Sequence, residues 1–464
     1  MSGISVHVPK LETELGIDVY STHSRGIGGI LRKEIESFIV EEVLVDGSKA
    51  TIARPADGAI SAVLDSSNSA RRYLLCVLVK RDWDTIRAIR ALADGLKIDS
   101  RKIKTAGIKD AKAVTAQYIT IEDASPEDVQ QVQIKDLDVR PIGYVHSELS
   151  SYFLFGNSFH IVISGLQHSR EFLDRKIAET VEEMETIGGV PNFFGHQRFG
   201  TTRPVTHLVG KALVQGNFKD AAMLFLTKPS LYEHPQSIEV RRRLAETEDF
   251  KQASRNFPKQ LHYERLMLNH LAQRRMDFAG AYKRLPFKLQ ELFIQAYQSF
   301  LFNKFLSGRI KLNLRLDKAQ VGDYVVKVER SGLPMVQMKK RVNVADLKKT
   351  NKALREGSLR LAVPLIGLRQ QPSLGVQGNI ERQILSEEGI SPQAFKIKEI
   401  PEISLKGGLR AVLTPLNKFS FNIEENHTKC QLFVKSSFLL HRGSYATVFL
   451  RELMKPSNLI KAGF

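Results

Sequence analysis

The pattern of apolar and polar residues over the first part of the chain predicts strands and a helix in close succession. Residues 38–45 alternate loosely between apolar and polar positions and run into Asp46-Gly47, which is typical of a strand followed by a turn. Residues 73–80 are almost continuously apolar and predict a second strand. Residues 82–98 predict a helix, because apolar side chains recur at helical spacing at Ile86, Ile89, Leu92 and Leu96.

The segments that follow add two strands and another helix. Residues 104–107 lead into a turn at Lys109-Asp110, after which strand-like alternation resumes from Val114 to Thr120. Residues 157–165 predict a strand, and residues 171–187 predict a helix that ends at Gly188-Gly189. Since strands and helices interleave without the strict β-α alternation of a parallel sheet, we predict an α+β fold with a mostly antiparallel sheet.

The middle and the end of the chain have different patterns. Residues 219–307 are largely helical, with one amphipathic helix that stops near Gly308, and residues 310–365 predict short, basic, strand-like pieces. The tail predicts strands at 419–424 and 430–436. A last helix follows Arg442-Gly443-Ser444, with Ser444 as its expected N-cap.

Composition and charge then narrow the class of partner. The chain has 464 residues, 42% of them apolar and 25% charged, which is the composition of a globular protein with about three domains' worth of sequence. Its 68 Lys and Arg residues against 50 Asp and Glu residues give a net charge of +18. Such a basic excess predicts a polyanionic partner, with nucleic acid first and anionic membrane surfaces second.

The excess charge lies outside the first 60 residues, which hold six Lys and Arg residues against nine Asp and Glu residues. Each cluster alone is typical of a solvated face, whereas several together favour nucleic-acid contacts. The clusters are Lys97, Arg101, Lys102, Lys104, Lys109 and Lys112; Arg241, Arg242 and Arg243; Arg274 and Arg275; Lys339, Lys340 and Arg341; and Lys348, Lys349 and Lys352.

Several classes of function are disfavoured by what the sequence lacks. Two cysteines, Cys76 and Cys430, cannot build a disulfide framework, and neither a secretory signal nor a membrane-spanning apolar stretch is present, so we expect a soluble, cytoplasmic protein. A glycine-rich phosphate loop is absent from the sequence, so a nucleotide-driven or NAD-dependent enzyme is disfavoured. His427 and Cys430 form the only close His–Cys pair, which is too few ligands for zinc, so we expect neither metal nor cofactor.

Two segments combine residues that could carry chemistry. Residues 106–117 place one carboxylate, Asp110, among cations at a turn between two apolar strands; an ordinary β-turn is the simpler interpretation, but nearby cations favour the ionised form that a nucleophile or a general base needs. Residues 190–200 gather Phe193, Phe194 and Phe199 with two amides and Arg198 between glycines. Core packing explains most of these rings, yet an aromatic face beside amide and guanidinium donors is also what a flipped base requires.

The stretches around Asp110 and Phe194, together with residues 296–303 and 442–452, resemble the TruD family of tRNA pseudouridine synthases. Four motifs in the same order cover nearly the whole chain. The residues after the Phe-rich motif resemble the archaeal and eukaryotic branch of the family, at Arg203, Thr206, His207 and Gly210.

The resemblance implies a pseudouridine synthase catalytic domain interrupted by an α+β insertion domain of the TruD type. We place the first part of the catalytic domain at 1–215, the insertion at 216–408 and the last part of the catalytic domain at 409–464. The resemblance further implies that Asp110 is the essential aspartate, that Asn192 and Phe194 are active-site residues, and that a uridine at tRNA position 13 is isomerised to pseudouridine without a cofactor. The implied partner is tRNA, and we expect a monomer.

One position departs from the family pattern. The family usually has a Lys six residues before the Phe of its first motif, whereas this chain has Arg32 there, followed by Lys33. Either residue keeps a positive charge near Asp110, but Arg and Lys differ in geometry. In the mechanism that the resemblance implies, Phe194 packs against the uracil, Asn192 holds the loop or the nucleotide, and Arg198 with Arg32 orients carboxylate and phosphate.

Two other functions are compatible with a basic chain of this kind. A non-catalytic RNA-binding protein on the same fold would bind RNA equally well without the Asp110 carboxylate. An RNA methyltransferase would need a cofactor site, for which no glycine-rich strand-to-helix turn is visible.

Overall fold

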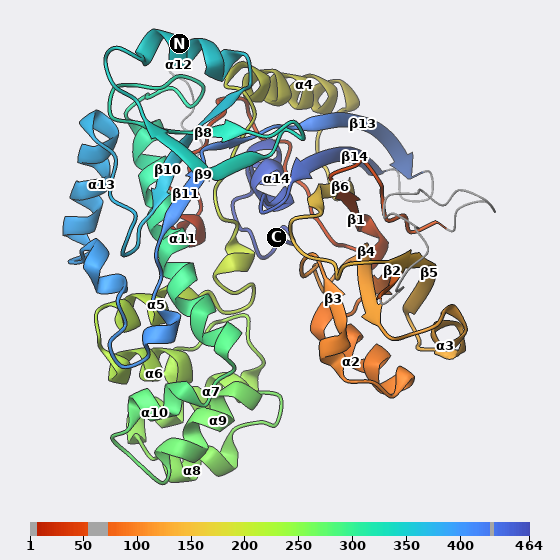
Figure 1. The fold of residues 1–464 in the computed structure, drawn as a ribbon, viewed down its shortest axis with the longest axis vertical. Helices are drawn as coiled ribbons and strands as arrows, with labels where there is room; N and C mark the ends of the chain where they lie inside the picture. The colour runs from red at the N-terminus through yellow and green to blue at the C-terminus, as the bar shows by residue number, and fades with distance from the viewer. Residues whose placement is uncertain (1–6, 54–72, 427–430) are drawn as a thin grey trace. The chain divides into compact units, whose positions relative to one another are not determined.

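The structure of the protein is a computed structural model that describes residues 7–53, 73–426 and 431–464. The chain divides into two compact units (Figure 1). The first unit comprises residues 22–190 and 414–464, and the second comprises residues 5–21 and 191–413, apart from residues outside the described ranges. The second unit thus includes residues 191–215, which the sequence-based division assigned to the catalytic domain; that division stays a prediction.

The described residues of the first unit form an eight-stranded sheet in the order β13-β14-β6-β1-β4-β2-β5, with β3 paired to β4 (Figure 1). Among the strands that the structure describes in this sheet, β1 pairs with β4 in parallel and the other pairs are antiparallel. The mostly antiparallel α+β fold is therefore confirmed. The strands are β1 (Phe38–Leu44), β2 (Tyr73–Arg81), β3 (Ile103–Thr105), β4 (Val114–Glu122), β5 (Leu137–Val145), β6 (Leu154–Ile163), β13 (Asn417–Asn426) and β14 (Gln431–His441).

Both faces of the central strands are buried, which explains why β2 is continuously apolar. Alternate residues of a strand point to opposite faces. Leu74, Cys76 and Leu78 therefore lie on one face, where they pack against α2 (Thr85–Leu96) and α3 (Pro126–Gln131). Leu75 and Val77 pack on the other face with side chains of β1, β4 and the loop before β6.

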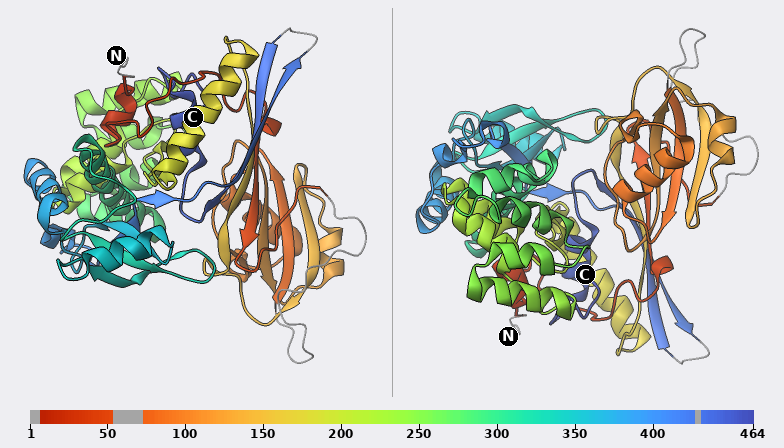
Figure 2. Two further views of the ribbon diagram at one scale, coloured as in Figure 1. Left: turned by 90° about the horizontal axis from the view of Figure 1, so that it is seen from above. Right: turned by 90° about the horizontal axis from the view of Figure 1, so that it is seen from below.

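The remaining helices of the first unit are α4 (Arg170–Thr186) and α14 (Ala446–Met454). The long strands β13 and β14, blue in Figure 2, run side by side as a hairpin. The prediction that Ser444 is the N-cap of α14 is wrong, because Tyr445 occupies the N-cap position. The paired residues His427 and Cys430 lie outside the described residues.

Helices dominate the first half of the second unit, as predicted. The long helix α11 (Phe287–Lys311) is buried on most of its circumference and extends three residues beyond the predicted end at Gly308. Helix α5 packs against it at Gly210, where a Cβ atom would lie 2.0 Å from the Phe293 carbonyl oxygen, so only glycine allows this approach. The other helices are α1 (Lys10–Glu14), α5 (Thr206–Val214), α6 (Phe218–Thr227), α7 (Pro235–Thr247), α8 (Phe250–Asn256), α9 (His262–Leu271) and α10 (Phe278–Lys283).

The second half of this unit contains an antiparallel four-stranded sheet in the order β11-β10-β8-β9. Its strands are β8 (Tyr324–Val328), β9 (Pro334–Arg341), β10 (Leu359–Leu365) and β11 (Gly408–Ala411), with α12 (Leu347–Arg355) and α13 (Gly375–Glu387) between them. The prediction of strands throughout 310–365 is wrong for α12, whose buried Thr350 and Leu354 follow helical spacing. Short strands β7 (Val190–Pro191) and β12 (Leu413–Thr414) lie where the chain passes between the units.

No helix within 7–53, 73–426 and 431–464 is both long enough and apolar enough to span a membrane.

Candidate active site

Asp110 lies in the loop between β3 and β4, directly before β4 begins at Val114. Because β4 runs antiparallel to β2 and parallel to β1, the start of β4 meets the end of β2 and the start of β1: Arg81 is opposite Val114, and so is Ile39. The Asp110 side chain is 38% exposed. The sheet thus holds one carboxylate at the edge where three strand ends meet, and leaves it accessible to a substrate.

Arg32, and not Lys33, lies beside this carboxylate. The Nη2 atom of Arg32 is 3.5 Å from Oδ2 of Asp110, while Lys33 is exposed. Arg32 adopts a left-handed backbone conformation with φ of 52°, donates a hydrogen bond to the Gly463 carbonyl oxygen at 2.8 Å, and stacks over the Phe38 ring at 3.9 Å. Burial lowers the pKa of Arg32, and the Asp110 carboxylate opposes that shift.

Lys80, at the end of β2, anchors the main chain at Asp110. Its side chain is fully buried, and its Nζ donates to the carbonyl oxygens of Asp110 at 2.6 Å and of Trp83 at 2.7 Å. Burial lowers the pKa of Lys80 to about 8. A cation linked to two carbonyl groups restrains the loop that carries the carboxylate.

Lys109 turns away from solvent and makes a buried ion pair with Glu42 of β1. The Glu42 side chain is fully buried, and its Oε2 also accepts the Tyr118 N–H at 2.8 Å. Burial raises the pKa of Glu42, while the charge of Lys109 acts in the opposite direction. The Lys109 N–H donates to the Thr85 hydroxyl at 3.0 Å. Consecutive residues 109 and 110 are therefore fixed from opposite sides, and only Asp110 presents its charge to solvent.

The second predicted group lies in the second unit, on the loop after β7. The Asn192 amide is held at both ends, because its Nδ2 donates to the Ala411 carbonyl at 3.0 Å and its Oδ1 accepts from Arg410 Nη2 at 2.7 Å. Buried Asn303 of α11 clamps the main chain of Phe194, accepting from its N–H at 2.8 Å and donating to its carbonyl at 3.1 Å.

Two guanidinium groups lie over the Phe194 ring. Arg410 is 4.0 Å and Arg198 is 5.9 Å from the ring centroid. Arg198 donates to Gln295 at 2.9 Å and to the Ser299 hydroxyl at 3.3 Å, so α11 sets its position. The two groups of predicted site residues are thus each ordered within their own unit: Asp110 with Arg32 in the first, and Asn192 with Phe194 and Arg198 in the second.

Comparison with known proteins decides the family. A family model described as tRNA pseudouridine synthase D (TruD) matches residues 14–453. The chain belongs to the tRNA pseudouridine synthase D family. Membership confirms the predicted enzyme class, an isomerase that makes pseudouridine.

Individual relatives match over almost their whole length. "Probable tRNA pseudouridine synthase D" of Methanosarcina acetivorans is 38% identical over 456 residues, covering 98% of this chain and 99% of the relative. The protein of the same description from Pyrococcus furiosus is 34% identical over 440 residues, covering 94% and 98%. A crystal structure of a TruD protein from Methanosarcina mazei superimposes with a TM-score of 0.79 at 36% identity, covering 97% of this chain and 98% of that one.

Sequence patterns did not single out several residues that order the candidate site. Glu42, Lys80 and Arg410 are charged residues within strands, and each contacts a predicted site residue or its neighbour. The only local signal was a charge interrupting an apolar pattern, at position 80 in an apolar run and at position 42 in an alternating one.

In the basic cluster around Asp110, Lys109 is buried and is not available to a polyanion. Three other cations of the cluster pair with carboxylates but keep accessible side chains, at 88% exposure for Arg101, 39% for Lys102 and 43% for Lys104. The pairs are Arg101 with Asp99, Lys102 with Asp123, Lys104 with Glu148, and Lys109 with Glu42.

Arg241 corrects the interpretation of the triple-arginine cluster as a surface feature. It is 1% exposed and pairs with Glu233 at 3.1 Å and with Glu264 at 2.7 Å, the carboxylates that also pair with Arg203. Burial, and after it the charge of Arg241, lowers the pKa of Arg203 to about 10. Arg241 therefore stabilises the helical part of the second unit and is not available to RNA.

Exposed cations also gather along β9 and α12, a group of residues that we call the basic face. Strand β9 is an edge strand, and its Lys340 pairs with Asp346, the N-cap of α12. The basic face consists of Lys339, Lys340, Arg341, Lys348, Lys349, Lys352 and Arg355, all exposed.

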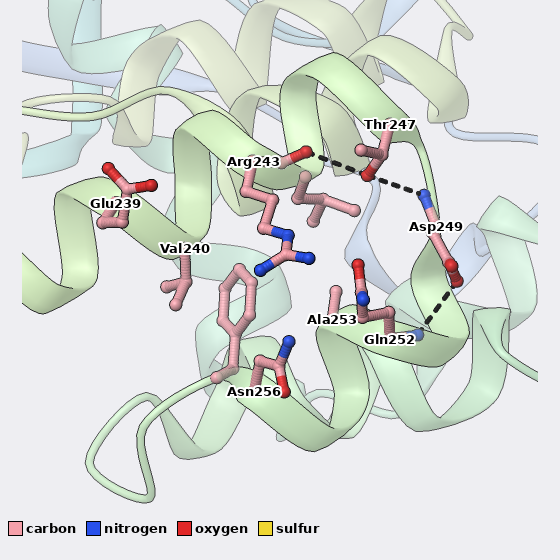
Figure 3. Close-up of a pocket in the computed structure, with 10 residues that line it drawn as sticks. Glu239, Val240, Arg243, Thr247, Asp249, Gln252, Ala253 and Asn256 are labelled. Atoms are coloured by element: carbon pink, nitrogen blue, oxygen red, sulfur yellow. Dashed lines mark hydrogen bonds between the residues drawn. The ribbon is translucent and has the colours of Figure 1, made fainter.

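A pocket of about 280 Å³ lies between α7 and α8 (Figure 3). Arg243 points into it among Glu239, Thr247 and Asp249, so carboxylates line it as well as a cation. It contains none of the predicted site residues. Across the described ranges, no group of three His, Cys, Asp or Glu residues is arranged to hold a metal ion.

Proposed function

We propose that this protein isomerises a uridine of tRNA to pseudouridine, with Asp110 as the essential carboxylate and the uridine at position 13 as the target. The observation that carries the proposal is the Asp110 loop. Its main chain is anchored by Lys80 at 2.6 Å, its preceding residue is paired with buried Glu42, and its carboxylate remains partly exposed with Arg32 at 3.5 Å.

The chemistry needs no external reactant, because the product is an isomer of the substrate. The bond between C1′ of the ribose and N1 of uracil breaks, the base rotates, and a bond forms between C1′ and C5. The proton that C5 loses is balanced by the proton that N1 gains. Asp110 acts either as the nucleophile toward the sugar or base, or as the base that moves a proton.

Arg32 pairs with the Asp110 carboxylate, with Nη2 at 3.5 Å from Oδ2. Its guanidinium is itself held by the Gly463 carbonyl and the Phe38 ring, so the two charges keep a defined geometry. Phe194 packs against the uracil. Asn192 and Arg198, which follow β7 as Phe194 does, hold the nucleotide.

The basic face supplies contacts to the RNA backbone, which needs cations but no sequence-specific geometry. We also propose that residues 216–408 are an insertion in a catalytic domain formed by residues 1–215 and 409–464. The protein acts as a monomer in the cytoplasm.

Tritium release from tRNA labelled at C5 of uridine tests the proposal, since the isomerisation expels the C5 hydrogen. We expect the full-length protein to release tritium from a transcript with uridine at position 13, and Asp110→Asn to release none. Asp123→Asn is a matched control, because Asp123 is exposed and has φ of 55°, a conformation that Asn tolerates. It should react as the unsubstituted protein does.

Unchanged tritium release by folded Asp110→Asn would contradict the role of the aspartate. RNA binding without any tritium release by the unsubstituted protein would favour a non-catalytic RNA-binding protein, and a methylated product would favour a methyltransferase.

A further inference from the structure

Arg410, near the end of β11, contacts both residues that the proposed function assigns to the base. Its Nε donates to the Asn192 carbonyl oxygen at 2.8 Å, its Nη2 donates to Asn192 Oδ1 at 2.7 Å, and its guanidinium lies 4.0 Å from the centre of the Phe194 ring. All three residues belong to the second unit.

These contacts determine how the Asn192 amide is oriented. An amide can exchange its donor and acceptor ends by rotating half a turn, and here the two ends have different partners. Arg410 is only a donor, so Oδ1 faces it, and the Ala411 carbonyl is only an acceptor, so Nδ2 faces that side. Without Arg410, Asn192 would lose the hydrogen bonds that now reach its Oδ1 and its carbonyl oxygen from that side chain.

Phe194 is fixed differently. Its main chain is clamped by Asn303, and its ring makes a T-shaped contact with Phe302 at 5.6 Å between ring centroids. The Arg410 guanidinium lies over the ring at 4.0 Å, and an arginine suits this contact because it can interact with a ring face while its N–H groups donate hydrogen bonds. One side chain therefore links the amide and the ring.

We propose that Arg410 is a positioning residue for the base: it holds Asn192 in one amide orientation and restrains the Phe194 ring, so that both residues meet the target uracil already ordered. This inference rests on the proposed function, since it takes the role of Asn192 and Phe194 from it. Preorganised groups act on the reaction step because their ordering does not have to occur during it.

Steady-state kinetics with full-length protein and a tRNA transcript test the inference. We expect Arg410→Gln to lower kcat by about 10²-fold, a loss typical of misplaced reacting groups, and to leave the KM for tRNA unchanged because the basic face is intact. Arg410→Lys keeps the charge but cannot donate to both Asn192 oxygens while stacking, so it should restore only part of kcat. Melting curves of both variants show whether a lowered kcat comes from folded protein.

Arg360→Gln is the matched control. Arg360 lies on β10 of the same sheet, is partly buried, and contacts neither Asn192 nor Phe194. It should keep the kcat of the unsubstituted protein. A double-mutant cycle with Asn192→Ala adds a second test. If Arg410 acts through Asn192, Arg410→Gln should reduce kcat less in the Asn192→Ala background than in the unsubstituted protein, because both substitutions remove the same interaction. If Arg410 only stabilises the fold, the two reductions in kcat should be equal.

Unchanged kcat in folded Arg410→Gln, full restoration by Arg410→Lys, or strict additivity in the cycle would each overturn the inference. If Arg410→Gln does not fold, Arg410→Lys replaces it in the kinetics and in the double-mutant cycle with Asn192→Ala, and the same outcomes support or overturn the inference. These failures differ from failure of the proposed function, in which even the unsubstituted protein forms no pseudouridine.

Discussion

The buried ion pair between Glu42 and Lys109 makes a quantitative prediction about the stability of the first unit. Their side chains are 0% and 5% exposed. Removing one partner of such a pair leaves an uncompensated buried charge and destabilises a protein by about 3 to 5 kcal/mol. Glu42→Gln keeps an oxygen for the Tyr118 N–H at 2.8 Å, so the lost charge accounts for most of the effect.

Urea unfolding followed by tryptophan fluorescence measures this effect in the correct unit. Trp83 is the only tryptophan of the chain and lies in the first unit. With a denaturant slope of about 3 kcal/mol per M, the expected destabilisation lowers the midpoint by about 1 to 2 M urea. Replacing both partners by Met removes the unpaired charge as well, so the double variant should be more stable than either single one.

Glu36→Gln provides the control, since Glu36 pairs with Arg81 in the same unit but both side chains are about half exposed. An exposed pair contributes about 0 to 1 kcal/mol, so its midpoint should scarcely move. The reasoning would be refuted if Glu42→Gln unfolded at the same urea concentration as Glu36→Gln, or if the double variant lost the sum of the two single losses.

Three further predictions concern the second unit. Replacing Lys348 and Lys349 by Ala should make the salt dependence of tRNA affinity shallower, lowering the slope of log K against log salt by about 1 to 2, and an unchanged slope would exclude the basic face from binding. Arg241→Met should lower stability by about 3 to 5 kcal/mol in melts followed by circular dichroism, whereas exposed Arg242→Gln should leave the melting temperature unchanged. Burial lowers the pKa of His207 to about 4. As pH falls from about 6.5 to 4, His207 binds a proton in the unfolded chain before it does in the folded one, so the folded protein loses stability. His207→Gln should remove up to about 3 kcal/mol of this loss, and an unchanged dependence of the unfolding free energy on pH would contradict the prediction.

Local periodicity was sufficient to predict the elements that carry the site. The run at 73–80 and the helical spacing at 82–98 correspond to β2 and α2. β2 buries most of its run, and α2 packs Ile89, Leu92 and Leu96 of its pattern against the sheet, whereas Ile86 is exposed. Ser444 failed as a predicted cap because α14 begins one residue later than a cap there would require. Helix α12 was missed because its exposed lysines hide the two buried positions that mark its helical period.

Contacts between distant residues were the part that the sequence could not reveal. Lys80 reaches a carbonyl 30 residues away, and Glu42 reaches a backbone amide 76 residues away. Arg241 looks like its two exposed neighbours in the sequence, and only the fold brings Glu233 and Glu264 to it. The residues next to a single charge in the sequence do not show whether its side chain pairs with a buried partner or faces solvent.

Mapping pseudouridine in tRNA from cells with and without this gene is the measurement that tests the central claim most directly. The account predicts that pseudouridine at position 13 disappears without the gene, returns with the unsubstituted gene, and does not return with Asp110→Asn expressed at the same level. Pseudouridine that persists at position 13 without the gene, or returns with Asp110→Asn, would contradict it.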